Sequence, residues 1–159
     1  MSKLSPGNNS FKLSPRPPTN SVLSVYAAGT AYQLTNTAAL LTFGTTSPSL
    51  TITSPGTYLI LGRVRVDYNG ATFAASRTLT LKFRRTNNTA ADLTNGSTAF
   101  LTDIVTTKVA TMTDDELPHV IYTTQNSNDI IQIFGDVDTV PSAGSLDASE
   151  AEIIAIKLS

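Results

Sequence analysis

The sequence predicts an all-β protein: an antiparallel sandwich or jelly roll of many short strands, preceded by an extended N-terminal arm. From residue 21 to the end of the 159-residue chain, apolar and polar residues alternate with a period of two, and turn-forming residues separate the alternating segments. The polar residues include 25 threonines and 16 serines, whereas only 14% of the chain is charged. Threonine is β-branched and favours the pleated, half-exposed surface of a sheet.

Residues 1–20 are expected to form a basic, extended anchoring arm. They contain four of the eight prolines and three basic but no acidic residues. Residues 21–159, the predicted jelly-roll domain, carry 8 basic and 12 acidic residues, so the two segments have charges of +3 and −4. The tetrapeptide Lys-Leu-Ser-Pro occurs twice, beginning at Lys3 and at Lys12.

We interpret this repeat as two copies of a docking peptide, in which the proline limits the entropy lost on binding. A chance recurrence in a biased linker is the alternative. The residues expected to anchor the arm are Lys3, Leu4, Phe11, Lys12, Leu13 and Arg16.

The clearest alternation predicts half-buried antiparallel strands at residues 58–68, 78–84 and 119–123. In the first of these, Tyr58 and the following valines share one face, and Arg63 and Arg65 share the other. Asn69-Gly70 is a turn signal, and residues 147–152 are expected to form at most one short turn of helix. The remaining expected strands are 22–26, 32–35, 40–43, 49–53, 100–106, 109–113, 129–134 and 151–158.

The last expected strand, residues 151–158, has apolar residues on both faces. One face of an antiparallel sandwich normally meets water, so this pattern indicates that another subunit covers the second face. Leu59 and Leu61, beside Arg63, indicate the same on the neighbouring strand. The predicted trimer interface consists of Tyr58, Leu59, Leu61, Ile153, Ile154, Ile156 and Leu158.

Three segments resemble the superfamily of tumour necrosis factor (TNF) and the complement globular heads. Residues 54–60 (SPGTYLI) are similar to its strand opening aP-x-x-G-x-Y-x-f, and residues 128–133 (NDIIQI) to its late strand G-D-x-V-x-L. Residues 153–158 are similar to its final buried strand. The resemblance extends over residues 22–159 and implies a jelly roll of about ten strands that assembles as a tight homotrimer.

The chain also departs from that superfamily. Asn128 replaces the usual glycine, and the sequence has no cysteine, no collagen-like stalk and no transmembrane anchor. These departures argue against an animal cytokine or complement component. They favour the trimeric jelly rolls of phage virions, such as decoration (cement) proteins and fibre tips.

The composition argues against several classes of function. Without cysteine the chain has no disulfide and no thiolate metal site, and the single histidine, His119, is not accompanied by a nucleophile signature such as G-x-S-x-G. The sequence has no cluster of lysines and arginines that would favour binding to nucleic acid. No apolar run reaches the roughly 18 residues that span a bilayer. We therefore expect no enzymatic activity, no cofactor, no essential metal and no membrane insertion, with His119 at the surface or an interface.

Four polar sets are weaker candidates for binding. Two are acidic and suggest Ca²⁺ ligands or, as the alternative, solvated loops: Asp114, Asp115 and Glu116; and Asp136, Asp138 and Asp147. Arg63, Arg65, Arg84 and Arg85 form either an anion-binding stripe or trimer salt bridges with the acidic loops. A polar loop suited to contacting sugar contains Asn87, Asn88, Asn95 and Ser97.

These observations predict a structural virion protein, a homotrimer that decorates and cements a phage capsid. Its partners would be further copies of itself and the major capsid protein, to which the arm would anchor it. It would be made in the host cytoplasm and lie on the capsid surface. The alternative is the receptor-binding tip of a tail fibre or spike that recognises host glycan, and the third hypothesis is a secreted trimer that binds carbohydrate or protein.

Overall fold

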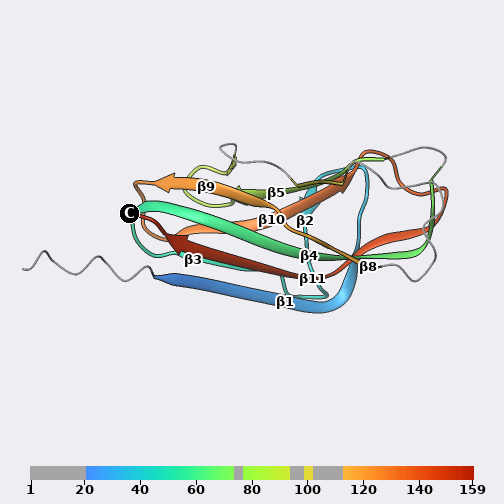
Figure 1. Cartoon of the computed structure of the whole chain (residues 1–159), viewed down its shortest axis with the longest axis horizontal. Helices are drawn as coiled ribbons and strands as arrows, with labels where there is room; N and C mark the ends of the chain where they lie inside the picture. Colours follow the sequence, from blue (N-terminus) through green and yellow to red (C-terminus); the bar gives the residue numbers. More distant parts are fainter. Residues whose placement is uncertain (1–20, 74–76, 94–98, 102–112) are drawn as a thin grey trace, which may run out of the picture.

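The computed structural model describes residues 21–73, 77–93, 99–101 and 113–159. In these residues, eleven strands form two antiparallel sheets that pack face to face (Figure 1). The predicted all-β antiparallel sandwich is therefore confirmed. Within the described ranges, no helix is long and apolar enough to cross a membrane.

The five-stranded sheet is built around the two longest strands, β4 (Gly56–Thr72) and β11 (Ala143–Lys157). β1 (Val22–Gln33) pairs with β11 at one edge. At the other edge, β8 (Thr113–Glu116) and β9 (His119–Thr124) pair with successive stretches of β4. Because β4 and β11 are both central, their outward residues lie in the middle of this sheet's outer face.

The six-stranded sheet is built around β5 (Leu79–Arg85) and β10 (Asp129–Val137), which pair with each other. Its short outer strands add to one or the other of these two. β10 is flanked by β2 (Ala39–Leu40) and β3 (Ser49–Ile52), and β5 by β6 (Ala91–Asp92) and β7 (Ala99–Leu101).

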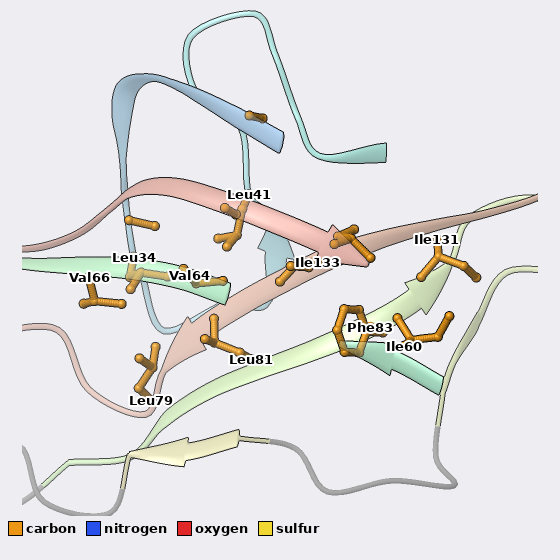
Figure 2. Packing of buried hydrophobic residues seen from close by; sticks show 14 of the residues in the cluster. Leu34, Leu41, Ile60, Val64, Val66, Leu79, Leu81, Phe83, Ile131 and Ile133 are labelled. Atoms are coloured by element: carbon orange, nitrogen blue, oxygen red, sulfur yellow. The ribbon is translucent and has the colours of Figure 1, made fainter. Parts of the chain in front are cut away.

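The core lies between the sheets, and most of its side chains come from alternating positions of β4, β5, β10 and β11 (Figure 2). The alternation in β4 and β10 is nearly unbroken, so each strand contributes a row of buried apolar side chains. Tyr58 and Ile153 belong to this core. The members labelled in Figure 2 are Leu34, Leu41, Ile60, Val64, Val66, Leu79, Leu81, Phe83, Ile131 and Ile133.

Two expectations about local structure, a turn and a helical turn, are wrong. Asn69-Gly70 lies inside β4 and not in a turn, because a bulge accommodates the pair: Ser145 of β11 lies opposite both residues, and Gly70 has a φ of 66°. Residues 147–152 belong to β11 and not to a helical turn, because pairing with β1 on one side and β4 on the other overrides their weak local preference.

Candidate assembly surface

The outer face of the five-stranded sheet carries apolar side chains in register across four strands. In one row, Ile156 of β11 lies between Val22 of β1 and Leu59 of β4, and Leu59 in turn lies opposite Ile121 of β9. In the next row, Ile154 lies opposite Leu61. We call these six residues the apolar patch: Val22, Leu59, Leu61, Ile121, Ile154 and Ile156.

The apolar patch is open to solvent at its edges. Val22 is 60% exposed and Ile121 51% exposed, whereas the four central members are half-buried by their strand neighbours. Leu117, which links β8 and β9, is 64% exposed. Single exposed apolar residues are ordinary on a protein surface, but a contiguous patch across a sheet marks an interaction site.

A hollow of about 240 Å³ lies at the border of the apolar patch. Its walls are mostly apolar, but they include one carboxylate and one guanidinium. The lining residues are Leu61, Gly62, Arg63, Leu117, Glu152 and Ile154.

A charged strip follows the apolar patch on the same face and consists of Tyr26, Arg63, Asp115 and Glu150. Arg63 Nη2 lies 2.8 Å from Glu150 Oε1, and Arg63 Nη1 lies 3.7 Å from Asp115 Oδ1. The Tyr26 hydroxyl donates to Glu150 Oε2 at 2.6 Å. This hydrogen bond and the Arg63 charge outweigh burial and hold the pKa of Glu150 below its ordinary value, while the same bond raises the pKa of Tyr26.

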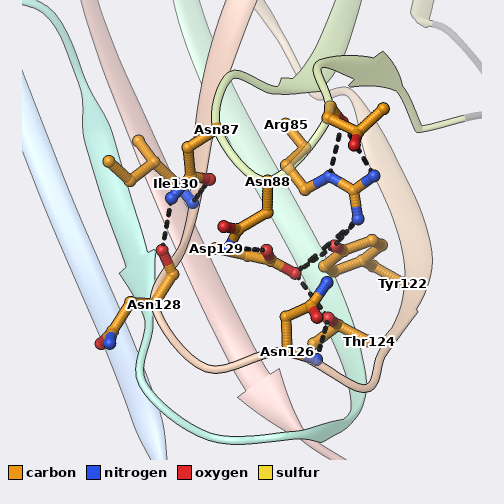
Figure 3. A network of polar contacts seen from close by, with 10 residues as sticks. Arg85, Asn87, Asn88, Tyr122, Thr124, Asn126, Asn128, Asp129 and Ile130 are labelled. Atoms are coloured by element: carbon orange, nitrogen blue, oxygen red, sulfur yellow. Dashed lines mark hydrogen bonds and ion pairs between the residues drawn. The ribbon is translucent and has the colours of Figure 1, made fainter.

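A second polar site surrounds Asp129, which begins β10 and is fully buried (Figure 3). The Tyr122 hydroxyl donates to Asp129 Oδ2 at 2.6 Å, and Thr124 Oγ1 donates to the same oxygen. Asn88 Nδ2 donates to Oδ1 at 2.9 Å, and Arg85 Nη1 lies 3.9 Å from Oδ2. Burial alone would raise the pKa of Asp129, but these hydrogen bonds and the Arg85 charge outweigh it and lower that pKa.

The groups that contact Asp129 lie on β9, at the end of β5 and in the loop after β5, so the site joins these segments to β10. The neighbouring Asn87 does similar work: its Nδ2 donates to the Asn128 carbonyl at 2.6 Å, and its Oδ1 accepts from the Ile130 amide at 2.7 Å. The Asn87 side-chain amide therefore takes the place of the backbone groups that would otherwise form hydrogen bonds with β10 at this point. The Asp129 network therefore stabilises one end of the sandwich.

Comparison with solved structures identifies the arrangement of the strands. The globular domain of zebrafish complement 1qA protein superposes with a TM-score of 0.52 and 11% identity, over 89% of this chain and 98% of that one. Murine APRIL superposes with a TM-score of 0.51 and 12% identity, over 88% of this chain and 100% of that one. This chain has a TNF/C1q-like jelly-roll fold.

The same jelly roll also occurs inside a larger viral protein. VP2 of infectious bursal disease virus, solved as a subviral particle, superposes with a TM-score of 0.53 and 13% identity. That match covers 91% of this chain and 37% of VP2, so this jelly roll spans about a third of the viral chain. No protein-family profile and no curated protein sequence matches the chain.

The residues predicted for a trimer interface divide between the two faces of the jelly roll. Tyr58 and Ile153 point into the core of their own chain, where they are 1% and 0% exposed, so they offer no surface to a partner. Leu59, Leu61, Ile154 and Ile156 lie in the apolar patch, and Leu158 is exposed just beyond β11. The predicted arm residues Lys3, Leu4, Phe11, Lys12, Leu13 and Arg16 lie outside the described residues.

The acidic candidates do not come together. Asp114, Asp115 and Glu116 form β8 and not a loop, so the alternation of the strand sends neighbouring side chains to opposite faces. Asp147 accepts hydrogen bonds from Asn69 and, at 2.8 Å, from Ser145 on the five-stranded sheet, whereas Asp136 lies on β10 of the other sheet. In the part of the chain that the structure describes, no three His, Cys, Asp or Glu side chains are grouped to hold a metal ion.

The arginine and asparagine candidates are also separated. Arg63 and Arg65 lie on β4 of one sheet and Arg84 and Arg85 on β5 of the other, so they do not form one stripe. Asn87 and Asn88 use their side-chain amides within the chain, while Asn95 and Ser97 lie outside the described residues. His119 begins β9, opposite Leu61, and is exposed on the outer face.

Two groups of residues have a role in the structure that the sequence pattern did not indicate. Val22, Leu117 and Ile121 extend the apolar surface beyond β4 and β11. A signal for Ile121 was present, since it is an apolar residue on the polar side of an alternating strand. Asp129 lies in the NDIIQI segment, but that pattern gives no indication of its donors, which lie on two other segments: β9, and the end of β5 with the loop after it.

Proposed function

We propose that this chain is a structural, non-enzymatic protein that assembles as a homotrimer through the outer face of its five-stranded sheet. The observation that carries the proposal is the apolar patch, which crosses four strands without a charged residue. Burial of apolar surface contributes about 25 cal/mol per Å², and stable interfaces bury on the order of 800 Å² per partner. A second copy of the chain is the partner that the TNF/C1q-like fold favours.

We further propose that the trimer decorates a phage capsid and lies on its outer surface. The TNF/C1q-like jelly roll occurs within VP2 of a viral particle, which supports a place in a virion. The basic, proline-rich residues 1–20 supply a segment suited to reach across a neighbouring protein, and the major capsid protein would be its partner.

A second candidate function is an independent binding module, either secreted or at the tip of a viral fibre, that recognises host glycan or protein. The match to the complement domain covers 98% of that chain and the match to APRIL 100%. This jelly roll therefore has the extent of a free-standing domain, whereas it spans only 37% of VP2.

Sedimentation of the purified chain tests assembly, and co-sedimentation with particles lacking the protein tests decoration. We expect a trimer at micromolar concentration that binds the particles, and loss of binding when residues 1–20 are deleted. A stable monomer would contradict the assembly proposal. A trimer that ignores the particles but binds a glycan array would favour the second function.

A further inference from the structure

Glu152 lies at the boundary between the apolar patch and the charged strip, where it lines the hollow. It is directly opposite Arg63 in the register of β11 and β4. The Arg63 guanidinium is nevertheless engaged by Glu150 and Asp115. Among the described residues, Glu152 has no hydrogen-bond or ion-pair partner.

Any partner that covers the apolar patch also removes Glu152 from water. Burial of a carboxylate is strongly unfavourable unless a cation pairs with it, and the one guanidinium lining the hollow, Arg63, already pairs with Glu150. A covering surface that brings a further cation to Glu152 is therefore favoured. The hollow has apolar walls from Leu61, Leu117 and Ile154 beside that carboxylate. This combination suits a side chain with an aliphatic stem and a cationic head, such as arginine.

Arg65 has these properties and lies on the same outer face of β4. Its side chain is 48% exposed, and its nearest carboxylate is Asp67, with Nε 3.9 Å from Oδ1. That separation is too long for a hydrogen bond, so the donors of Arg65 are available. Arg63, by contrast, already donates a hydrogen bond of 2.8 Å to Glu150.

We propose that Arg65 of each copy enters the hollow of the next copy and pairs with Glu152 there. This inference rests on the proposed homotrimer. In a cyclic trimer the contacts are heterologous, so different parts of one face meet and a cation of one copy reaches a carboxylate of its neighbour. Three such pairs per trimer would fix the rotation of the subunits, while the apolar patch supplies most of the free energy of association.

Charge reversal tests the pair directly. We expect Glu152→Arg and Arg65→Glu each to weaken assembly by about tenfold per contact, or about a thousandfold for a trimer with three contacts. The double variant Glu152→Arg with Arg65→Glu should restore most of this loss. Lys82→Glu is the matched control, since Lys82 pairs with Asp92 on the other sheet and should leave assembly unchanged.

The trimer dissociation constant is measured by sedimentation equilibrium, and circular dichroism shows that each variant is folded. If the wild type is a trimer and both single reversals leave its dissociation constant unchanged, the Arg65–Glu152 pair is wrong although the trimer stands. Single losses without recovery in the double variant also overturn the pair. A monomeric wild type overturns the homotrimer and, with it, this inference.

Discussion

Leu61 on β4 and Ile154 on β11 face each other across adjacent strands, on the side of the sheet that points away from the core. The residue next to Ile154, Ile153, is fully buried on the opposite side. β11 therefore presents apolar side chains to both of its faces. In a single copy, the described residues cover the inner face of β11 and leave its outer face partly open to solvent.

Ile154→Asp should convert the trimer to a monomer. The substitution places a carboxylate in the centre of the apolar patch, opposite Leu61, where assembly would bury the new charge without compensation. Ile154 is only half-buried in the single chain, so the monomer should remain folded. Sedimentation velocity gives the oligomeric state, and thermal melting followed by circular dichroism confirms the fold.

Thr51→Asp provides the control for this change, because Thr51 is exposed on β3 of the other sheet. The control should remain trimeric. If Ile154→Asp sediments as a trimer at the wild-type concentration dependence, the subunits associate through a different surface.

Asp129→Asn should lower the free energy of unfolding by about 2–3 kcal/mol. The asparagine amide keeps one acceptor oxygen. Its NH₂ group, however, replaces a carboxylate oxygen that accepts hydrogen bonds in the wild type, among them those from the Tyr122 and Thr124 hydroxyls. Tyr122→Phe removes one donor and should cost about 1.5 kcal/mol. Urea denaturation measures both values.

Asp92→Asn is the comparison for the Asp129 variant. Asp92 also pairs with a cation, Lys82 at 2.8 Å, but its side chain is exposed, so the loss should stay below about 1 kcal/mol. Equal losses for Asp92→Asn and Asp129→Asn would show that the buried network adds no stability beyond that of a surface ion pair.

The same network predicts how stability depends on pH. The pKa of Asp129 is lowered in the folded chain, relative to about 3.9 in an unfolded one. For a lowered pKa, the stabilisation is fully present above the unfolded pKa and is lost as the pH falls through the folded pKa. Wild-type stability should therefore fall below about pH 4, and Asp129→Asn should lack this part of the decline.

Urea denaturation of the wild type and of Asp129→Asn, from about pH 7 down to about pH 3, provides the measurement. Other carboxylates titrate equally in both proteins, so the difference between the two curves isolates Asp129. Parallel curves over this range would mean that Asp129 titrates alike in the folded and unfolded states.

Period-two alternation predicted most of the sandwich from the sequence, because a half-buried strand must place every second residue in the core. It also indicated that β11 carries apolar residues on both faces, as Ile153 and Ile154 do. Alternation alone did not show which strands are neighbours, so the contribution of Ile121 and Val22 to the same patch depended on the pairings of β9 and β1. Register depends on how several strands pair, so the sequence of one strand alone does not determine it.

The errors have a similar origin. Tyr58 was predicted at the trimer interface, although the alternation places it on the same face as Ile60 and Val64, and that face is the buried one. Asn69-Gly70 favours a turn locally, but pairing with β11 holds β4 extended through it with a bulge. Asp129 belongs to the NDIIQI segment noted in the sequence, but its donors Asn88, Tyr122 and Thr124 lie on two other segments, so the local pattern did not predict the buried network.

We expect residues 1–20 to hold the trimer on a particle mainly through their apolar side chains. Each buried leucine contributes about 1.5–3 kcal/mol, whereas attraction from exposed lysines is screened beyond about 8 Å at physiological salt. Leu4→Ala with Leu13→Ala should therefore weaken particle binding more than Lys3→Ala with Lys12→Ala. Three arms per trimer would multiply either effect through avidity.

Co-sedimentation with undecorated particles at low and high salt separates the two contributions. The leucine variant should bind weakly at both salt concentrations, while the lysine variant should differ from the wild type mainly at low salt. Both variants should remain trimeric, because the proposed interface lies on the five-stranded sheet and does not involve the arm. If both variants decorate particles at wild-type occupancy, attachment is made by the jelly roll itself, and the surfaces to test next are its exposed loops.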